Sequence, residues 1–154
     1  MSENRRDFMK LTGVFGLLAA AGLLTTGEAL AQQQAWNKAA FDTKSLADTY
    51  KVLVGTPAES ADIAITAPDI AENGAVVPVA VASKIPNTQA VYILVEKNPN
   101  MLAAGFNIPQ GTSADIATRI KMGQTSNVYA VVKADNKFYV ASKEVKVTLG
   151  GCGG

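Results

Sequence analysis

Short runs of alternating apolar residues, separated by turn-forming residues, constrain the fold of this chain more than any other feature. Successive side chains of a β-strand point to opposite faces, so such alternation predicts strands with one buried face. Val77, Val79 and Val81 share one face of a run that follows the turn signal Asn73-Gly74. We expect strands at Ile63–Ala67, Ala75–Ser83, Ala90–Glu96, Met101–Ile108, Val128–Lys133 and Lys137–Leu149, and either a strand or a helix at Ala114–Met122.

About seven short strands at intervals of about ten residues are typical of an all-β sandwich. The apolar faces of the two sheets would pack against each other. The fold class predicted for the chain is therefore mainly β, an immunoglobulin-like antiparallel β-sandwich. The Cys…Trp…Cys pattern of antibody domains is absent, because the chain has one Cys and one Trp. The prediction thus concerns the architecture alone.

A helix is predicted before the first strand, from Ala35 to Gly55. Its apolar positions recur at spacings that favour one helical face: Phe41, Leu46, Tyr50, Leu53 and Val54. Gly55 and then Pro57 are typical of the residues that end a helix. We therefore expect an N-terminal helix attached to the β-sandwich.

The N-terminus carries the features of a bacterial export signal. Arg5 and Arg6 precede Phe8, as in the twin-arginine signal, and an apolar stretch follows. Ala29 and Ala31 then form an A-x-A cleavage site. A membrane anchor is the alternative, but a spanning helix needs about 20 apolar residues and this stretch is shorter. We expect residues 1–31 to be removed and the protein to reside in the periplasm without a membrane anchor.

The C-terminus holds the only cysteine, Cys152, between Gly150 and Gly151 on one side and Gly153 and Gly154 on the other. Glycine loses more conformational freedom on ordering than any other residue, so we expect residues 150–154 to form a flexible arm on a domain of residues 32–149. Fully extended, three residues carry the thiol about 10 Å from Leu149. A leftover cysteine in an exported protein indicates an intermolecular bond or a reactive free thiol.

Composition excludes several classes of function. The chain has 14 Lys and Arg and 13 Asp and Glu, so its charges nearly balance. This balance does not indicate nucleic acid as a partner. The chain has no histidine, which removes the commonest general base, a usual zinc ligand and the Cys-His nucleophile pair. Neither a metal site nor a phosphate-binding loop has the required spacing, so we expect no metal and no cofactor. Lys143 or Lys146 could lend positive potential to an anion held at Cys152.

An unassisted thiol favours a carrier over an enzyme. A free cysteine has a pKa of about 8.5, so only a few per cent of it is thiolate near neutral pH. No positive charge lies in the five residues before Cys152. The chemistry at Cys152 should therefore be supplied by partner proteins.

The export signal, the size of the domain and the terminal Gly-Gly-Cys-Gly-Gly together resemble the SoxY family, the sulfur-carrier subunits of the periplasmic thiosulfate-oxidising Sox system. The segment from Lys97-Asn98-Pro99-Asn100 to Phe106 is similar to that family as well. The resemblance covers the mature chain, and residues 150–154 are its most specific element.

This resemblance implies an immunoglobulin-like fold and a heterodimer with SoxZ, which is exported in complex with its partner. It also implies that Cys152 is the attachment site. The haem protein SoxXA would join thiosulfate to the thiol, SoxB would hydrolyse off sulfate, and a sulfane dehydrogenase, where present, would oxidise the remaining sulfur. An alternative from the residues alone is an exported binding module whose cysteine forms an intermolecular disulfide.

Overall fold

The computed structural model describes residues 38–53 and 55–149. All of them belong to one of the two units into which the chain divides, Asn37–Gly154. The predicted export signal and its cleavage site lie outside the described residues. None of the helices in the described ranges has the length and apolar character needed to cross a bilayer.

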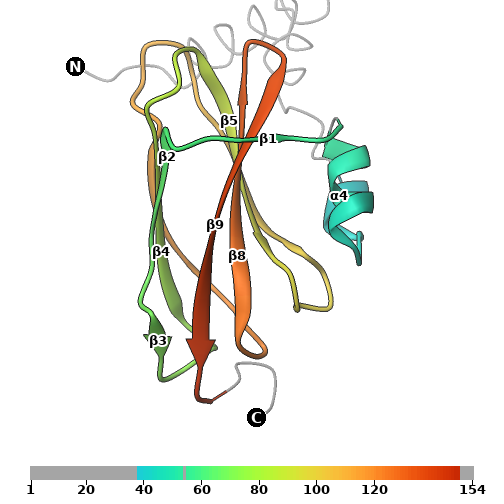
Figure 1. Cartoon of the computed structure of the whole chain (residues 1–154), viewed down its shortest axis with the longest axis vertical. Helices are drawn as coiled ribbons and strands as arrows, with labels where there is room; N and C mark the ends of the chain where they lie inside the picture. The colour runs from blue at the N-terminus through green and yellow to red at the C-terminus, as the bar shows by residue number, and fades with distance from the viewer. Residues whose placement is uncertain (1–37, 54, 150–154) are drawn as a thin grey trace, which may run out of the picture. The chain divides into compact units, whose positions relative to one another are not determined.

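Two sheets form a β-sandwich (Figure 1). The larger sheet has the strand order β1-β9-β8-β5-β6, with β3 also paired to β9, and the smaller sheet has the order β2-β4-β7. The strands are β1 (Ala58–Glu59), β2 (Ile63–Thr66), β3 (Ile70–Ala71), β4 (Val77–Ser83), β5 (Thr88–Val95), β6 (Leu102–Asn107), β7 (Asp115–Ile120), β8 (Ser126–Ala134) and β9 (Lys137–Val147). The mainly β, immunoglobulin-like sandwich predicted from the sequence is confirmed.

Each alternating run of the sequence forms a strand, and the ambiguous segment 114–122 contains strand β7. Alternation does not indicate β1 and β3, because each has only two residues. Both run parallel to β9 and pair with different parts of its outer edge. Between them the chain leaves the larger sheet to form β2 in the smaller one.

The main core lies between the two sheets. Residues from β4, β5, β8 and β9 that face inward are completely or almost completely buried, among them Val79, Ile93, Val128 and Val145. Burial of this kind contributes about 25 cal/mol per Å² of apolar surface. The alternation of the sequence thus corresponds to one core face on each strand.

A second core lies on the other face of the larger sheet, where the helices pack. Leu94 of β5 and Val131 of β8 are buried there against Leu53 of the helical segment. Strand β5 is therefore buried on both faces. Because a strand between a sheet and helices has no solvent-facing side, its sequence is an almost continuous run of apolar residues, as in Tyr92–Val95.

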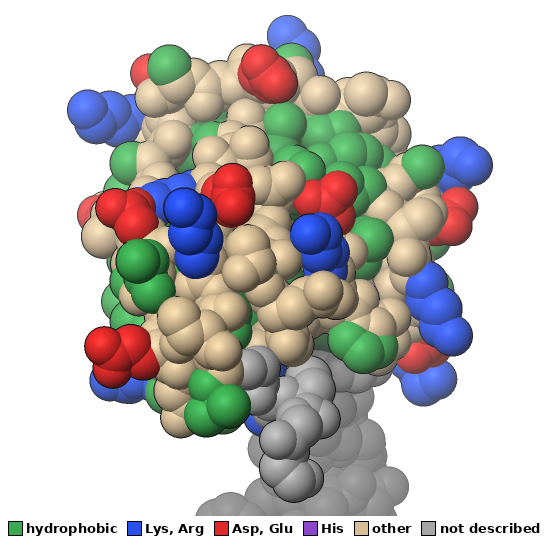
Figure 2. Space-filling model, turned by 60° about the horizontal axis from the view of Figure 1, so that its bottom comes forward, with side chains coloured by type: hydrophobic (Ala, Val, Ile, Leu, Met, Phe, Trp, Pro, Cys, Tyr) green, Lys and Arg blue, Asp and Glu red, His purple; other side chains and the backbone are tan. Residues whose placement is uncertain are grey.

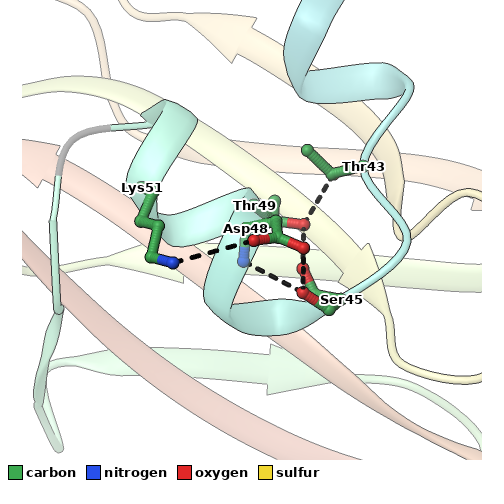
Figure 3. A network of polar contacts seen from close by, with 5 residues as sticks. All are labelled: Thr43, Ser45, Asp48, Thr49 and Lys51. Atoms are coloured by element: carbon green, nitrogen blue, oxygen red, sulfur yellow. Dashed lines mark hydrogen bonds and ion pairs between the residues drawn. The ribbon is translucent and has the colours of Figure 1, made fainter.

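The single helix predicted over Ala35–Gly55 is wrong in one respect, because the structure has two short helices, α3 (Lys38–Phe41) and α4 (Leu46–Leu53). Ser45 is the N-cap of α4, since its Oγ accepts a hydrogen bond of 3.1 Å from the Asp48 amide (Figure 3). The hydroxyls of Thr43 and Thr49 lie 2.6 Å apart. These side chains bond to the local backbone, which separates the two helices at this point.

Candidate functional site

The predicted site residues all lie outside the described residues, so the structure tests none of them. They are the attachment residue Cys152, the arm residues Gly150, Gly151, Gly153 and Gly154, the export residues Arg5, Arg6 and Phe8, and the cleavage residues Ala29 and Ala31. The structure describes the end of β9 and the residues around it, which directly precede residues 150–154 in the chain.

The end of β9 is held by strands on both sides. Strand β8 pairs antiparallel with it as far as Val145, and β3 pairs parallel with Lys146 and Val147. The Lys146 amide donates to the Asp69 carbonyl over 2.9 Å, and the Val147 amide donates to Thr125 Oγ1 over 2.9 Å. Hydrogen bonds on both edges of the strand therefore fix the position of the end of β9 in the domain.

A loop between β3 and β4 holds the last two described residues. The Thr148 amide donates to the Ala71 carbonyl over 3.1 Å, and the Thr148 hydroxyl donates to the Glu72 carbonyl over 3.1 Å. The Gly74 amide donates to the Leu149 carbonyl over 2.7 Å. Since the Gly74 carbonyl also accepts from the Met122 amide over 2.7 Å, this loop joins the ends of both sheets.

Large apolar side chains are exposed at this end of the domain. Ile70, Val76 and Leu149 are 58%, 53% and 64% exposed, and only one other large hydrophobic side chain of the described residues, Val52, is exposed. All three belong to the segments that bond to one another around the end of β9. We call these three residues the apolar end surface. Such a surface is typical of a contact with another protein.

Charged side chains of both signs are spread singly over the face that Figure 2 shows, which brings the end of β9 forward. No large patch of one sign forms there. The composition, with nearly equal numbers of acidic and basic residues, agrees with this distribution. Long-range attraction of an anion by the described part of the domain is therefore weak on this face.

The two lysines of β9 lie in different environments. Lys143 is partly buried, and its Nζ lies 3.0 Å from Asp69 Oδ1 and 2.6 Å from the Ala67 carbonyl oxygen. Lys146 is exposed on the opposite face of the strand, as alternation predicts. The charge of Lys143 is thus neutralised by a carboxylate within the domain, whereas Lys146 forms no ion pair with any residue that the structure describes.

Three tyrosines, Tyr50, Tyr92 and Tyr129, pack against the second core, between the helical segment and the larger sheet. Burial raises the pKa of Tyr129, and the negative charge of Glu96 raises it further. The Tyr129 hydroxyl lies 3.4 Å from Glu96 Oε2, which also accepts a hydrogen bond of 2.9 Å from the side-chain Nδ2 of Asn127. Burial also raises the pKa of Tyr50 and of Tyr92. These phenols stay protonated at neutral pH, so none of them serves as a base for a thiol.

Candidate metal ligands are not gathered in the described part of the chain. Within residues 38–53 and 55–149, no three acidic, cysteine or histidine side chains are grouped as metal ligands. Sequence reasoning missed the Lys143–Asp69 pair and the apolar end surface. Both depend on β3 lying beside β9, which no local pattern indicates.

A family model for the sulfur oxidation protein SoxY matches residues 50–152, which include Cys152. Among solved structures, the sulfur carrier protein SoxY from Chlorobium limicola f thiosulfatophilum is 38% identical, with a TM-score of 0.60, over 66% of this chain and 94% of that one. A chain from a structure that concerns T cell activation by the bacterial superantigen toxic shock syndrome toxin-1 is 13% identical over 55% of this chain and 98% of that one. Its TM-score is 0.37, which is too low to support a conclusion.

The comparison with curated proteins gives no match. The family model nevertheless covers well over half of the chain, and the Chlorobium protein is similar to it in both sequence and fold. This chain belongs to the SoxY family of sulfur oxidation proteins.

Proposed function

We propose that the protein is a covalent carrier of sulfur intermediates in thiosulfate oxidation, with the thiol of Cys152 as the attachment site. The observation that carries this proposal is the extent of the family match, which runs through the β-sandwich and ends at the only cysteine of the chain. The Chlorobium relative is named a sulfur carrier protein. A carrier needs one reactive atom on a stable body, and the proposal assigns these roles to the Cys152 thiol and to the β-sandwich.

The end of β9 supports this function physically. Leu149 is bonded to the β3–β4 loop, and Cys152 follows three residues later. A thiol within about 10 Å of a fixed point can enter the active site of a partner while the domain stays outside. Covalent attachment keeps the intermediate from diffusing away as one partner replaces another.

The loading step requires an oxidant. The Cys152 thiol and thiosulfate form a new sulfur–sulfur bond, and the thiol proton and two electrons leave. The product is a cysteine S-thiosulfonate, and the electrons pass to the haem of SoxXA. Hydrolysis by SoxB then adds water, breaks the bond to the sulfonate sulfur and releases sulfate, which leaves a persulfide on Cys152.

The remaining members of the system follow from the same proposal. SoxZ would be the permanent partner, and a sulfane dehydrogenase would oxidise the persulfide sulfur where that enzyme is present. The carrier itself would not be an enzyme, and it would hold no cofactor. The twin-arginine signal with Arg5 and Arg6 would deliver it to the periplasm.

Mass spectrometry of the protein from thiosulfate-grown cells tests the proposal. We expect sulfur adducts on Cys152 that a reductant removes, and we expect Cys152→Ser to abolish thiosulfate oxidation. Normal oxidation by the Cys152→Ser variant would overturn the proposal. A disulfide-linked species as the only active form would instead support a binding module that links partners.

A further inference from the structure

The loop between β3 and β4 contains the only Asn-Gly pair of the chain, Asn73-Gly74. This loop lies beside the end of β9 and forms backbone hydrogen bonds with it (Figure 1). Asn73 is exposed, whereas Gly74 is buried. An asparagine that precedes glycine is open to attack by the next backbone amide, because glycine has no Cβ to hinder the close approach. Every other asparagine of the chain precedes a residue that has a side chain.

The reaction in question is deamidation, and it needs only the loop and water. The Gly74 amide nitrogen loses its proton and attacks Cγ of Asn73, and the carboxamide nitrogen leaves as ammonia. The new carbon–nitrogen bond closes a succinimide ring. Water then adds to either carbonyl of the ring and opens it, which leaves aspartate or isoaspartate in place of the asparagine. Because the net reaction is a hydrolysis, it requires neither an oxidant nor a reductant.

The electrophile of this reaction is prepared in the structure. The Ala75 amide donates a hydrogen bond of 2.8 Å to Asn73 Oδ1. An amide donor at this oxygen stabilises the negative charge that develops there when a nucleophile adds to Cγ. The same bond folds the side chain of Asn73 over the following backbone, as in an Asx-turn. The carboxamide carbon is therefore activated and held close to the backbone that would attack it.

The nucleophile, in contrast, is blocked. The Gly74 amide donates its hydrogen to the Leu149 carbonyl over 2.7 Å. The Gly74 carbonyl accepts from the Met122 amide over 2.7 Å, so both polar groups of this buried residue are bonded. An amide held in this way exchanges its proton with solvent only when the structure opens locally. Attack on Asn73 thus requires that Leu149 first separate from Gly74.

We infer that Asn73 is a modification site, at which the hydrogen bond between Gly74 and Leu149 holds back deamidation and at which the modified residue releases the end of β9. An isoaspartate carries the backbone through its own Cβ, which lengthens the chain by a methylene group. Gly74 is then displaced, and its bonds to Leu149 and Met122 no longer form together. The end of β9 thereby loses its contact with the β3–β4 loop. This inference does not depend on the sulfur chemistry proposed for Cys152.

Peptide mapping of the full-length protein, incubated at mildly alkaline pH, tests the inference. We expect Asn73 to convert to aspartate and isoaspartate far more slowly in the folded protein than in the same protein kept in urea. Thr148→Val removes the hydroxyl that donates to the Glu72 carbonyl over 3.1 Å and keeps the shape of the side chain. The conversion should then be about fivefold faster, because one lost hydrogen bond favours local opening at the end of β9. Thr118→Val, on β7, is the matched control and should react at the parent rate.

Hydrogen exchange separates local release from a general loss of structure. In Thr148→Val the Gly74 amide should exchange faster by the same factor as Asn73 deamidates, while the amides of β5 and β8 keep their rates. In the deamidated parent protein the amides of Gly74 and Thr148 should exchange faster as well. Asn73→Ser keeps an acceptor for the Ala75 amide but has no carboxamide, so it should retain the parent exchange pattern after the same incubation.

Three outcomes would overturn the inference. The first is an Asn73 reaction as fast in the folded protein as in urea, since the bond to Leu149 would then hold nothing back. The second is a deamidation rate in Thr148→Val that does not follow the exchange of the Gly74 amide. The third is the absence of any reaction at Asn73, either in urea or in Thr148→Val within the time in which the protein in urea reacts.

Discussion

The ammonium of Lys143 lies 3.0 Å from the carboxylate of Asp69, and this pair joins β9 to the segment that leads from β2 into β3. The same ammonium donates to the Ala67 carbonyl over 2.6 Å. Both contacts cross from β9 to residues about 75 positions earlier in the chain. Lys143 is therefore a structural residue of the domain, and its charge is not free to attract an anion at the C-terminus.

Lys143→Met should lower the free energy of unfolding by about 1 kcal/mol, since a partly buried charged hydrogen bond is lost. The reaction of Cys152 with an anionic disulfide reagent should keep its rate. Urea denaturation and stopped-flow thiol kinetics measure the two quantities.

The matched control is Lys38→Met, which removes the exposed Lys38–Asp42 pair on α3 and should cost less than about 0.5 kcal/mol. A large decrease in thiol reactivity with Lys143→Met would contradict this assignment and restore an electrostatic role for Lys143.

Ser45→Ala should destabilise α4, because the Asp48 amide loses its capping oxygen. We expect a loss of about 1 kcal/mol, the usual cost of removing an N-cap. Hydrogen exchange should show faster exchange in Leu46–Leu53 and unchanged exchange in the inner strands. Equal acceleration in β8 would mean that the helix and the sandwich unfold as one cooperative unit.

The folded protein should lose stability at alkaline pH through its partly buried tyrosines. Burial and Glu96 raise the pKa of Tyr129, so the folded state holds the phenolic proton more tightly than the unfolded state does. That contribution is complete below about pH 10, the unfolded value, and is lost as the pH rises through the folded pKa.

Urea midpoints between pH 8 and pH 11 test this expectation. Tyr129→Phe should show a shallower decline than the parent protein, because one phenol with a raised pKa is gone. Identical curves for the two proteins would show that other groups cause the alkaline loss. Between about pH 6 and pH 8 the midpoint should change little, since the chain has no histidine.

The sequence predicts the sandwich well where a strand has one face in the core and alternates, as β4 does. Val77, Val79 and Val81 all point into one core, and a shift of one residue would turn them to solvent. Strands β1 and β3 were not predictable, since two residues carry no period. The break between α3 and α4 depends on side-chain hydrogen bonds of Thr43 and Ser45, and apolar spacing does not show these.

The candidate site divides in the same way. The sequence singles out Cys152, because it is the only thiol of the chain and is flanked by glycines, and its role as the attachment site stays a prediction. The apolar end surface could not be predicted, because Ile70 lies between two expected strands and only the pairing of β3 with β9 places it at this end of the domain. The exposure of these side chains depends on contacts between residues far apart in the chain, and a local sequence pattern does not indicate such contacts.

Replacing Gly150 and Gly151 with valine tests whether the arm needs minimal bulk. Valine is restricted in its backbone and side-chain angles, so the arm would be stiffer and wider. The urea midpoint should be unchanged, while turnover by SoxXA and SoxB should slow. The same replacement with alanine is the milder control. Unchanged rates with every partner would show that access to Cys152 does not depend on these glycines.

Any enzyme that acts on Cys152 must approach to within about 10 Å of Leu149, because three extended residues reach no further. Such an enzyme would then contact the apolar end surface, which includes Ile70 at 58% exposure. We expect Ile70→Ser to lower kcat/KM for a partner enzyme about fivefold, the effect of losing about 1 kcal/mol at an interface. Since Ile70 is expected to contribute to binding and not to the chemical step, most of the decrease in kcat/KM should come from a higher KM.

Val52→Ser is the matched control, because Val52, on α4, is the other exposed large hydrophobic residue of the described part of the chain, at 37% exposure. Steady-state assays with the loaded carrier measure both variants, and a small disulfide reagent checks that Cys152 itself reacts normally in each. Equal losses for Ile70→Ser and Val52→Ser would indicate a general effect on the domain. A loss confined to Ile70→Ser would mean that partners recognise the folded end of β9 as well as the sulfur that Cys152 carries.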